Sequence, residues 1–152
     1  MKLQHLEGEE RMKDRYLYRA KRTDNGEWVK GYYTYYPNGF TSEDKMEHAI
    51  RDTFTSVDSH KLYFVDPSTI CQCTGLKDKN GNMVFENDIM SAHLDDIFPE
   101  DITYARVTWE DTGYCLREKE SIDIQPLEEN DMKYFTVCGN IFDNPELLEQ
   151  EG

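Results

Sequence analysis

Short segments of period-two alternation, separated by tight turns rich in asparagine and glycine, constrain the fold of this chain more than any other feature. Residues 15–21 alternate in this way and are rich in tyrosine. Asn25-Gly26 follows, and Asn-Gly favours a type I′ turn because both of its central residues need positive φ. Residues 27–36 are predicted as the return strand, which ends at Pro37-Asn38-Gly39. The pattern therefore predicts an antiparallel hairpin.

Further short strands are predicted along most of the chain. Asn87 interrupts one of them, and asparagine tolerates a left-handed backbone better than other non-glycine residues. We therefore expect a kink or bulge there that re-aims the strand. Asn144, as N-cap, and Pro145 predict a helix of one or two turns near the C-terminus. The remaining strands are expected at 61–65, 70–74, 83–85, 89–90, 104–109, 114–117, 122–124 and 134–138. This succession is typical of an all-β barrel or sandwich.

Charge is unevenly distributed along the chain. Its 152 residues include 17 Lys and Arg against 31 Asp and Glu, a formal net charge of −14. Residues 1–40 carry 8 basic and 6 acidic side chains, whereas residues 86–152 carry 4 and 18. The acidic C-terminal half would repel a phosphate backbone, which disfavours binding to duplex DNA.

The one basic stretch contains Lys13, Arg15, Arg19, Lys21 and Arg22, with Tyr16 and Tyr18 interleaved. It could form a small patch for a nucleic acid or an acidic partner. It could equally be the solvated face of an edge strand, where basic side chains discourage pairing with another chain. We favour the edge strand, because a nucleic-acid footprint normally makes the whole domain basic.

Compartment and thiol chemistry follow from what the chain lacks. It contains no apolar window of about 18 residues, and its N-terminus has no apolar signal-peptide core, so we expect a cytoplasmic protein without a membrane span. In a reducing cytosol the cysteines are expected as free thiols. We interpret them as small buried hydrophobes rather than metal ligands, because Cys-X-Cys is not a usual zinc spacing. The four are Cys71, Cys73, Cys115 and Cys138.

No catalytic signature is visible. The chain has no nucleotide-binding glycine loop and no nucleophile elbow, and His5, His48, His60 and His93 form no metal-binding pair. A magnesium-dependent hydrolase or nuclease is one alternative, and a solvated acidic loop is the interpretation that we favour. The acids in question are Asp95, Asp96, Glu100 and Asp101. We therefore expect no enzyme activity, no cofactor and no metal.

Four short motifs, in this order, resemble the YopX family of bacterial and phage proteins. They are Val-Asp-Pro through Thr69 at 65–69, TGLKDKNG at 74–81, FENDI at 85–89 and GNIFDNPELL at 139–148. The resemblance covers most of the chain from about Met12. The family usually has glycine at the position of Asn87, and apolar residues or glycine at those of Cys71 and Cys73.

The resemblance implies a β fold that contains an SH3-like barrel. We expect a flexible leader at 1–11, an N-terminal β region at 12–76 with an irregular or helical insertion at 41–57, the SH3-like barrel region at 77–142 and a short C-terminal helix or tail at 143–152. The motif acids Glu86 and Asp88 are expected to satisfy backbone N–H groups in turns rather than to catalyse.

The resemblance also implies a protein encoded by a phage, prophage or mobile element. We expect a non-enzymatic accessory protein that acts in a bacterial host cell through protein–protein contacts or self-assembly, because aromatic residues are favoured in interface cores. A homo-oligomer and a host or phage partner are expected, and a single-stranded nucleic-acid module remains a further alternative. The aromatic side chains in question are Trp28, Tyr32, Tyr33, Tyr35 and Tyr36.

Overall fold

The chain folds into two antiparallel sheets of six and five strands. The structure is a computed structural model, and it describes residues 14–38, 45–51, 61–94, 97–98, 100–111, 113–118 and 124–149. The predicted leader at 1–11 lies outside these residues. The mainly β class predicted from the sequence is confirmed. No closed barrel forms among the described residues, so the SH3-like barrel is not seen as such.

Eleven strands and three short 3₁₀ helices make up the described elements. The six-stranded sheet has the order β4-β3-β2-β1-β5-β6 and the five-stranded sheet has the order β10-β9-β8-β7-β11. The strands are β1 (Tyr18–Lys21), β2 (Trp28–Asn38), β3 (Lys45–Arg51), β4 (Leu62–Phe64), β5 (Cys71–Lys77), β6 (Met83–Phe85), β7 (Asp88–Ala92), β8 (Thr103–Glu110), β9 (Gly113–Glu118), β10 (Gln125–Pro126) and β11 (Thr136–Asn140). The 3₁₀ helices are η1 (Pro67–Thr69), η2 (Glu129–Lys133) and η3 (Pro145–Leu148).

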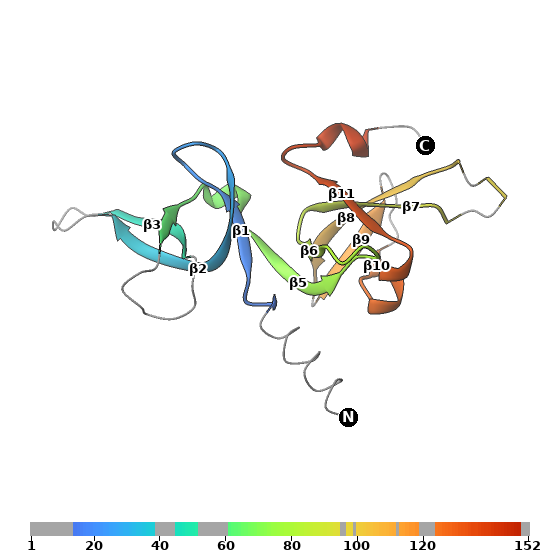
Figure 1. The fold of residues 1–152 in the computed structure, drawn as a ribbon, viewed down its shortest axis with the longest axis horizontal. Helices are drawn as coiled ribbons and strands as arrows, with labels where there is room; N and C mark the ends of the chain where they lie inside the picture. Colours follow the sequence, from blue (N-terminus) through green and yellow to red (C-terminus); the bar gives the residue numbers. More distant parts are fainter. Residues whose placement is uncertain are drawn as a thin grey trace, which may run out of the picture. The chain divides into compact units, whose positions relative to one another are not determined.

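Two compact units divide the chain, Met1–Cys73 and Thr74–Gly152. The division falls three residues before the predicted end of the N-terminal β region at residue 76. Strand β5 contributes to both units, because its start pairs with β1 through Gln72 and Cys71, whereas its end borders β6. Figure 1 follows the first unit from blue to green and the second from green to red.

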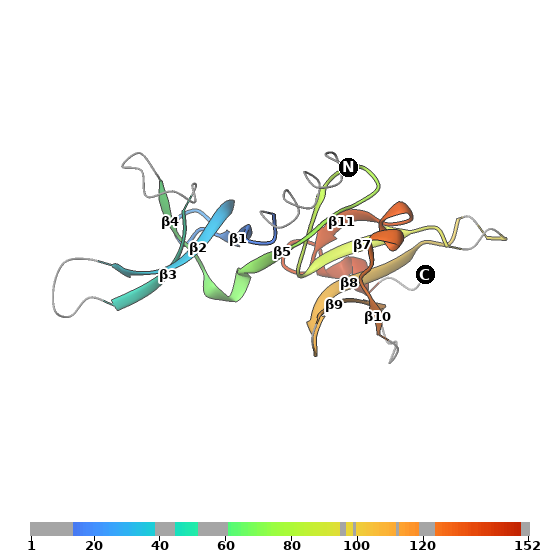
Figure 2. The same ribbon diagram turned by 90° about the horizontal axis from the view of Figure 1, so that it is seen from below.

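The first unit has a small core on one face of its sheet. Alternation along β1–β4 brings Ala20, Ile50 and Val65 together, with Tyr18, Val29 and Ile70 packed against them. The long hairpin of β2 and β3 extends from this core, and the two strands run side by side in Figures 1 and 2.

Strand β3 corrects the helical alternative for 41–57. Residues 45–51 are extended and pair with β2 from Tyr32↔Arg51 to Asn38↔Lys45. The spacing of Met46, Ala49 and Ile50 suits a helical stripe, but pairing with the long strand β2 overrides that local preference. The rest of 41–57 lies outside the described residues.

The second unit has the larger core. Strands β7 and β8 form a hairpin whose two arms run together in both views (Figures 1 and 2), and β9 pairs with β8. Helix η2 contributes Met132 to this core. The buried members are Val84, Met90, Ala92, Ala105, Val107, Leu116, Met132 and Phe135.

The C-terminal helix is η3, a single short 3₁₀ segment. Asn144 occupies the N-cap position, as predicted, but its side chain makes no capping hydrogen bond to η3. Its Oδ1 instead accepts from the backbone N of Asn140 at 3.2 Å. The Asn144 side chain lies directly over Gly139, so a Cβ at that position would collide with it.

Gly31 lies where β2 and β3 approach each other closely. A Cβ at Gly31 would meet the backbone oxygen of Arg51 and, at 2.8 Å, Ile50 Cγ2. We expect Gly31→Ala to lower the free energy of unfolding by about 1–3 kcal/mol, because the packed strands must shift apart. Gly113→Ala is the matched control, since nothing lies within 4 Å of the added carbon. Urea unfolding of both variants checks this, and equal midpoints would contradict it.

Candidate functional site

Asp78 is the one acid of the TGLKDKNG motif, and its carboxylate accepts several hydrogen bonds. It is 5% exposed, and its Oδ1 accepts from the backbone N of Asn80 at 2.9 Å and of Asn82 at 2.8 Å. Its Oδ2 accepts from the backbone N of Val137 in β11 at 2.9 Å. Burial alone would raise the pKa of Asp78, but the hydrogen bonds, led by that from Val137, hold the pKa below its ordinary value. The motif therefore ties a turn to a distant strand.

The FENDI motif is a sharp change of direction, as predicted. Asn87 has φ +70°, and the chain passes there from β6 of the six-stranded sheet to β7 of the five-stranded sheet. Asp88 is 1% exposed, and its Oδ2 accepts from the backbone N of Phe85 at 2.7 Å. The predicted turn role of Asp88 is thus confirmed.

Asn87 is held from three directions. Its backbone N donates to Val107 O at 2.8 Å, its carbonyl accepts from Ile141 N at 3.1 Å, and its Oδ1 accepts from Arg106 at 2.8 Å. Glycine at this position would supply the backbone conformation without the last contact. The asparagine side chain thus adds a link to β8.

Glu86, the first acid of the FENDI motif, has a carboxylate whose ionised form is disfavoured by burial. Its side chain is half-buried, and burial raises its pKa, although the positive charge of Arg106 acts in the opposite direction. The carboxylate is therefore less stable here than in water.

The two remaining motifs also form turns. Asp66 caps η1 by accepting from Ser68 N at 3.0 Å, and buried Thr69 accepts from the backbone N of Lys21 at 2.8 Å. In the closing motif Asn140 accepts from the backbone N of Phe142 and of Asp143. All four motifs thus form turns or connect strands.

The basic segment does not form an edge strand. β1 lies between β2 and β5, so the edge-strand interpretation is wrong. Arg19 and Lys21 lie on one face of β1 over the Trp28 ring, with 4.9 Å and 5.3 Å to its centroid. Tyr18 points to the opposite face, because side chains alternate along a strand. The interleaving of tyrosines and cations in the sequence therefore separates them in space. Lys13 lies outside the described residues.

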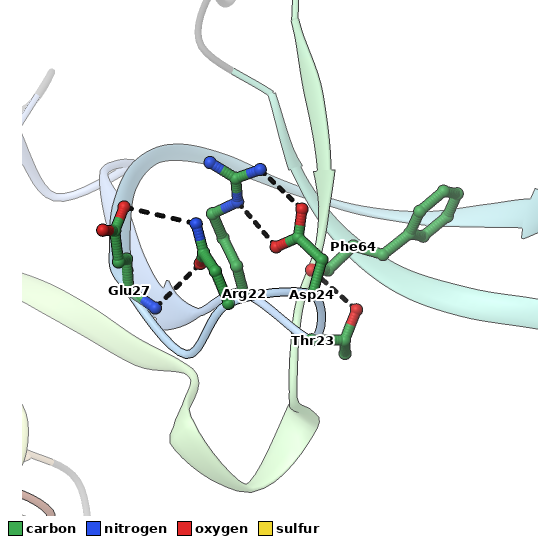
Figure 3. Close-up of polar contacts among 6 residues, drawn as sticks. Arg22, Thr23, Asp24, Glu27 and Phe64 are labelled. Atoms are coloured by element: carbon green, nitrogen blue, oxygen red, sulfur yellow. Dashed lines mark hydrogen bonds and ion pairs between the residues drawn. The ribbon is translucent and has the colours of Figure 1, made fainter.

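Arg22 closes the β1–β2 turn (Figure 3). Its guanidinium donates two hydrogen bonds to Asp24, at 2.9 Å and 2.6 Å, and lies 4.6 Å from the centroid of Tyr63. The hydrogen bond to Asp24 raises the pKa of Arg22, and that from Arg22 lowers the pKa of Asp24. This cation already has its own carboxylate partner.

The predicted type I′ turn is wrong. Gly26 has φ +73°, but Asn25 is not in a positive-φ conformation. The Asn25 side chain instead accepts from the backbone N of Glu27 at 2.9 Å, and Arg22 N donates to Glu27 O. The turn therefore contains more than two residues between Arg22 and Glu27. The Asn25 side chain stabilises it through its hydrogen bond to the backbone of the same loop.

The acidic loop and the histidines are not assembled into a described centre. Glu100 and Asp101 are exposed, and Asp95 and Asp96 lie outside the described residues. His48 and His93 belong to different units, and His5 and His60 lie outside the described part. Within the described ranges, no group of three or more His, Cys, Asp or Glu could hold a metal ion.

The cysteines are free thiols, as expected. Cys71, Cys73 and Cys115 are buried, which fits the interpretation as small hydrophobes. Cys138 is exposed, which corrects that interpretation at one position. It lies at a register shift between Val137 and Gly139 in β11, and its Sγ donates to the backbone oxygen of Ile89 at 3.3 Å.

Large apolar side chains are exposed in both units. Of the five aromatic residues singled out in the sequence, Trp28 and Tyr32 are half-buried, Tyr33 and Tyr35 are exposed, and the side chain of Tyr36 lies outside the description. Further exposed apolar side chains lie around the β7–β8 connection and in β8. They are Leu94, Ile97, Phe98, Ile102 and Trp109. Among the described residues, no helix has the length and apolarity needed to cross a bilayer.

Sequence reasoning missed two groupings. The contact of Asp78 with Val137 spans 59 residues and leaves no local signal. His48 packs against Tyr35, with 4.9 Å between ring centroids, because Tyr35 and His48 pair across β2 and β3. The alternation of Met46, His48 and Ile50 could have indicated that strand.

Asp78→Asn tests the buried carboxylate. At pH 7 we expect a loss of about 2–3 kcal/mol in unfolding free energy, because the backbone N–H groups of Asn80, Asn82 and Val137 lose the ionised carboxylate as their acceptor. A lowered folded-state pKa stabilises the fold above the ordinary value of 3.8, and the effect disappears as pH falls through the folded-state pKa. Urea unfolding between pH 7 and pH 3 should show the two proteins converging in acid. The exposed Asp101→Asn is the control, and a pH-independent difference would contradict the prediction.

Glu86→Gln tests the half-buried carboxylate of FENDI. A raised folded-state pKa stabilises the fold below the ordinary value of 4.5, and that contribution is lost as pH rises through the folded-state pKa. We therefore expect the variant to have a higher urea midpoint than the parent at pH 7 and a similar one near pH 4. Glu100→Gln, on an exposed loop, should change neither. A lower midpoint at pH 7 would show that attraction to Arg106 outweighs burial.

Comparison with known proteins agrees with these motifs. The family model described as YopX protein matches residues 17–149. The crystal structure of protein EF1440 from Enterococcus faecalis is similar, with a TM-score of 0.53 and 25% sequence identity, covering 86% of this chain and 96% of that chain. Among curated proteins, none matches. Since the family match spans both units and all four motifs, this chain belongs to the YopX family.

Proposed function

We propose that this chain is a phage- or prophage-encoded accessory protein that binds another protein and catalyses no reaction. The observation that carries the proposal is a group of exposed apolar side chains around the β7–β8 connection, which we call the apolar tip. Ile97 is 79% exposed, Phe98 52% and Leu94 49%. Exposed apolar side chains gathered at one place are typical of an interaction surface.

Charge defines the chemistry of the partner. The unit Thr74–Gly152 carries 6 Lys and Arg against 19 Asp and Glu, a formal net charge of −13. Glu100 and Asp101 lie in the same connection as the apolar tip. The surface that fits is therefore an apolar pocket with a basic rim, on a host or phage protein, since opposite potentials steer and align partners.

The motif acids support a role without catalysis. Asp78 and Asp88 accept hydrogen bonds from backbone N–H groups, and burial makes the Glu86 carboxylate costly. A general base must reach a substrate proton, whereas Asp78 and Asp88 are at most 5% exposed. We further propose that the strands of this unit form the SH3-like arrangement of the family. The change of sheet at Asn87 supports this, since small barrels turn strands sharply at such kinks.

Affinity capture from lysogenic host cells tests this function. We expect the full chain to retain one host or phage protein at low ionic strength and less of it at high ionic strength. The double variant Ile97→Ser with Phe98→Ser should lose it. The matched control is Ile124→Ser with Tyr134→Ser, because these side chains are 41% and 55% exposed in the same unit.

Two outcomes would contradict the proposal. Recovery of the same protein by parent and tip variant would exclude the apolar tip. Hydrolysis of nucleic acid or phosphate esters with Mg²⁺ or Mn²⁺, abolished when Asp95, Asp96 and Asp101 become asparagine, would favour a metal-dependent hydrolase.

A further inference from the structure

A row of aromatic side chains crosses three strands of the first unit, on the face that also bears its core. We call it the tyrosine face, and it consists of Tyr18, Tyr33, Tyr35 and His48. Tyr18 pairs with Gly31, two residues before Tyr33, and Tyr35 pairs with His48, so the four share one face. Ring centroids lie 5.7 Å apart for Tyr18 and Tyr33, and 5.7 Å for Tyr33 and His48.

The tyrosine face continues the core outward. The first unit buries Ala20, Ile50 and Val65 in its cluster, whereas the cluster of the second unit buries eight side chains. Beyond that small core, Tyr33 is 38% exposed and Tyr35 53% exposed. A sheet face that is apolar over this length normally packs against a second layer.

Two polar groups on this face are matched within it. The Tyr33 hydroxyl and His48 Nδ1 lie 2.5 Å apart and share a hydrogen bond. The rings are therefore held in place before any partner arrives, which reduces the entropy lost on binding. Tyrosine can also bury its ring and keep its hydroxyl at a wet rim, as interfaces require.

Charge indicates which partner this face suits. The unit Met1–Cys73 carries 11 Lys and Arg against 12 Asp and Glu, a formal net charge of −1, while the other unit carries −13. Two copies can meet through the first unit without the repulsion that the second would produce. We expect this face to bind a nucleic acid poorly. Arg19 and Lys21 lie over Trp28 on the opposite face, and Arg22 is paired with Asp24.

We propose that the tyrosine face is the interface of a homodimer, in which the same face of a second copy provides the missing layer. The contact is isologous, so each Tyr33–Tyr35–His48 group packs near its symmetry mate. Two sheets meeting face to face leave about 10 Å between them, which side chains of this size fill. This goes beyond the proposed function, because it involves the other unit of the chain.

Light scattering and sedimentation of the full chain between about 1 and 200 μM test the proposal. We expect a dimer that dissociates on dilution. Tyr35→Arg should weaken dimerisation about 100-fold, since two buried cations would face each other at the centre of a two-fold contact. Tyr134→Arg is the matched control, because Tyr134 is 55% exposed in the second unit, and it should dimerise like the parent. Circular dichroism and thermal unfolding establish that both variants fold.

Three results would overturn the dimer. The parent could remain monomeric at 200 μM, Tyr35→Arg could dimerise as tightly as the parent, or Tyr134→Arg could dissociate equally. Binding of a single-stranded oligonucleotide by a monomer, lost in Tyr35→Arg, would assign the face to nucleic acid instead. The variant Ile97→Ser with Phe98→Ser should still dimerise, so the failure of the apolar tip and the failure of the tyrosine face are distinguishable.

Discussion

The carboxylate of Asp78 connects parts of the second unit that are far apart in the sequence. It receives N–H groups from its own turn and from Val137 of β11. β11 leads directly to the turn at Asn140, after which Ile141 donates to the carbonyl of Asn87. Asn87 in turn donates to Val107 in the core. A low-dielectric interior strengthens such a network when every member is satisfied, so loss of the first acceptor affects the whole path.

This path explains why the four motifs contain so many polar residues. Asp66, Asp78, Asp88 and Asn140 each hold a backbone turn. Buried backbone N–H groups need acceptors, and short side chains supply them where strands end. The surfaces that we propose for interactions lie elsewhere, on the β2–β3 hairpin and the β7–β8 connection. The motifs of this chain thus serve its scaffold.

Local signals predicted the parts of the fold that depend on neighbouring residues. Strand β6 begins and ends at the predicted residues, and the left-handed position of Asn87 follows from its residue type. Two predictions failed where pairing between strands that are far apart in the sequence decides, because strand β3 needs β2 and the internal position of β1 needs β5. A third, the type I′ turn, failed locally, because the Asn25 side chain accepts from the backbone N of Glu27. Exposure of Tyr35 or Phe98 has no sequence signal, since either residue type could equally be buried. No site residue was predicted, and the surfaces were found only from the fold.

The turn at Asn80-Gly81 has a consequence for the chemical lifetime of the chain. In an unfolded peptide such a pair deamidates readily, because the glycine nitrogen attacks the asparagine side-chain carbonyl and closes a succinimide ring. Here the Gly81 nitrogen donates to Asp78 O at 3.0 Å, and Asn80 N is held by the same residue. Ring closure would require the hydrogen bond of the Gly81 nitrogen to open. Deamidation at this pair is therefore limited to molecules in which the turn has opened. The amount of isoaspartate formed at residue 80 would measure how often the turn opens.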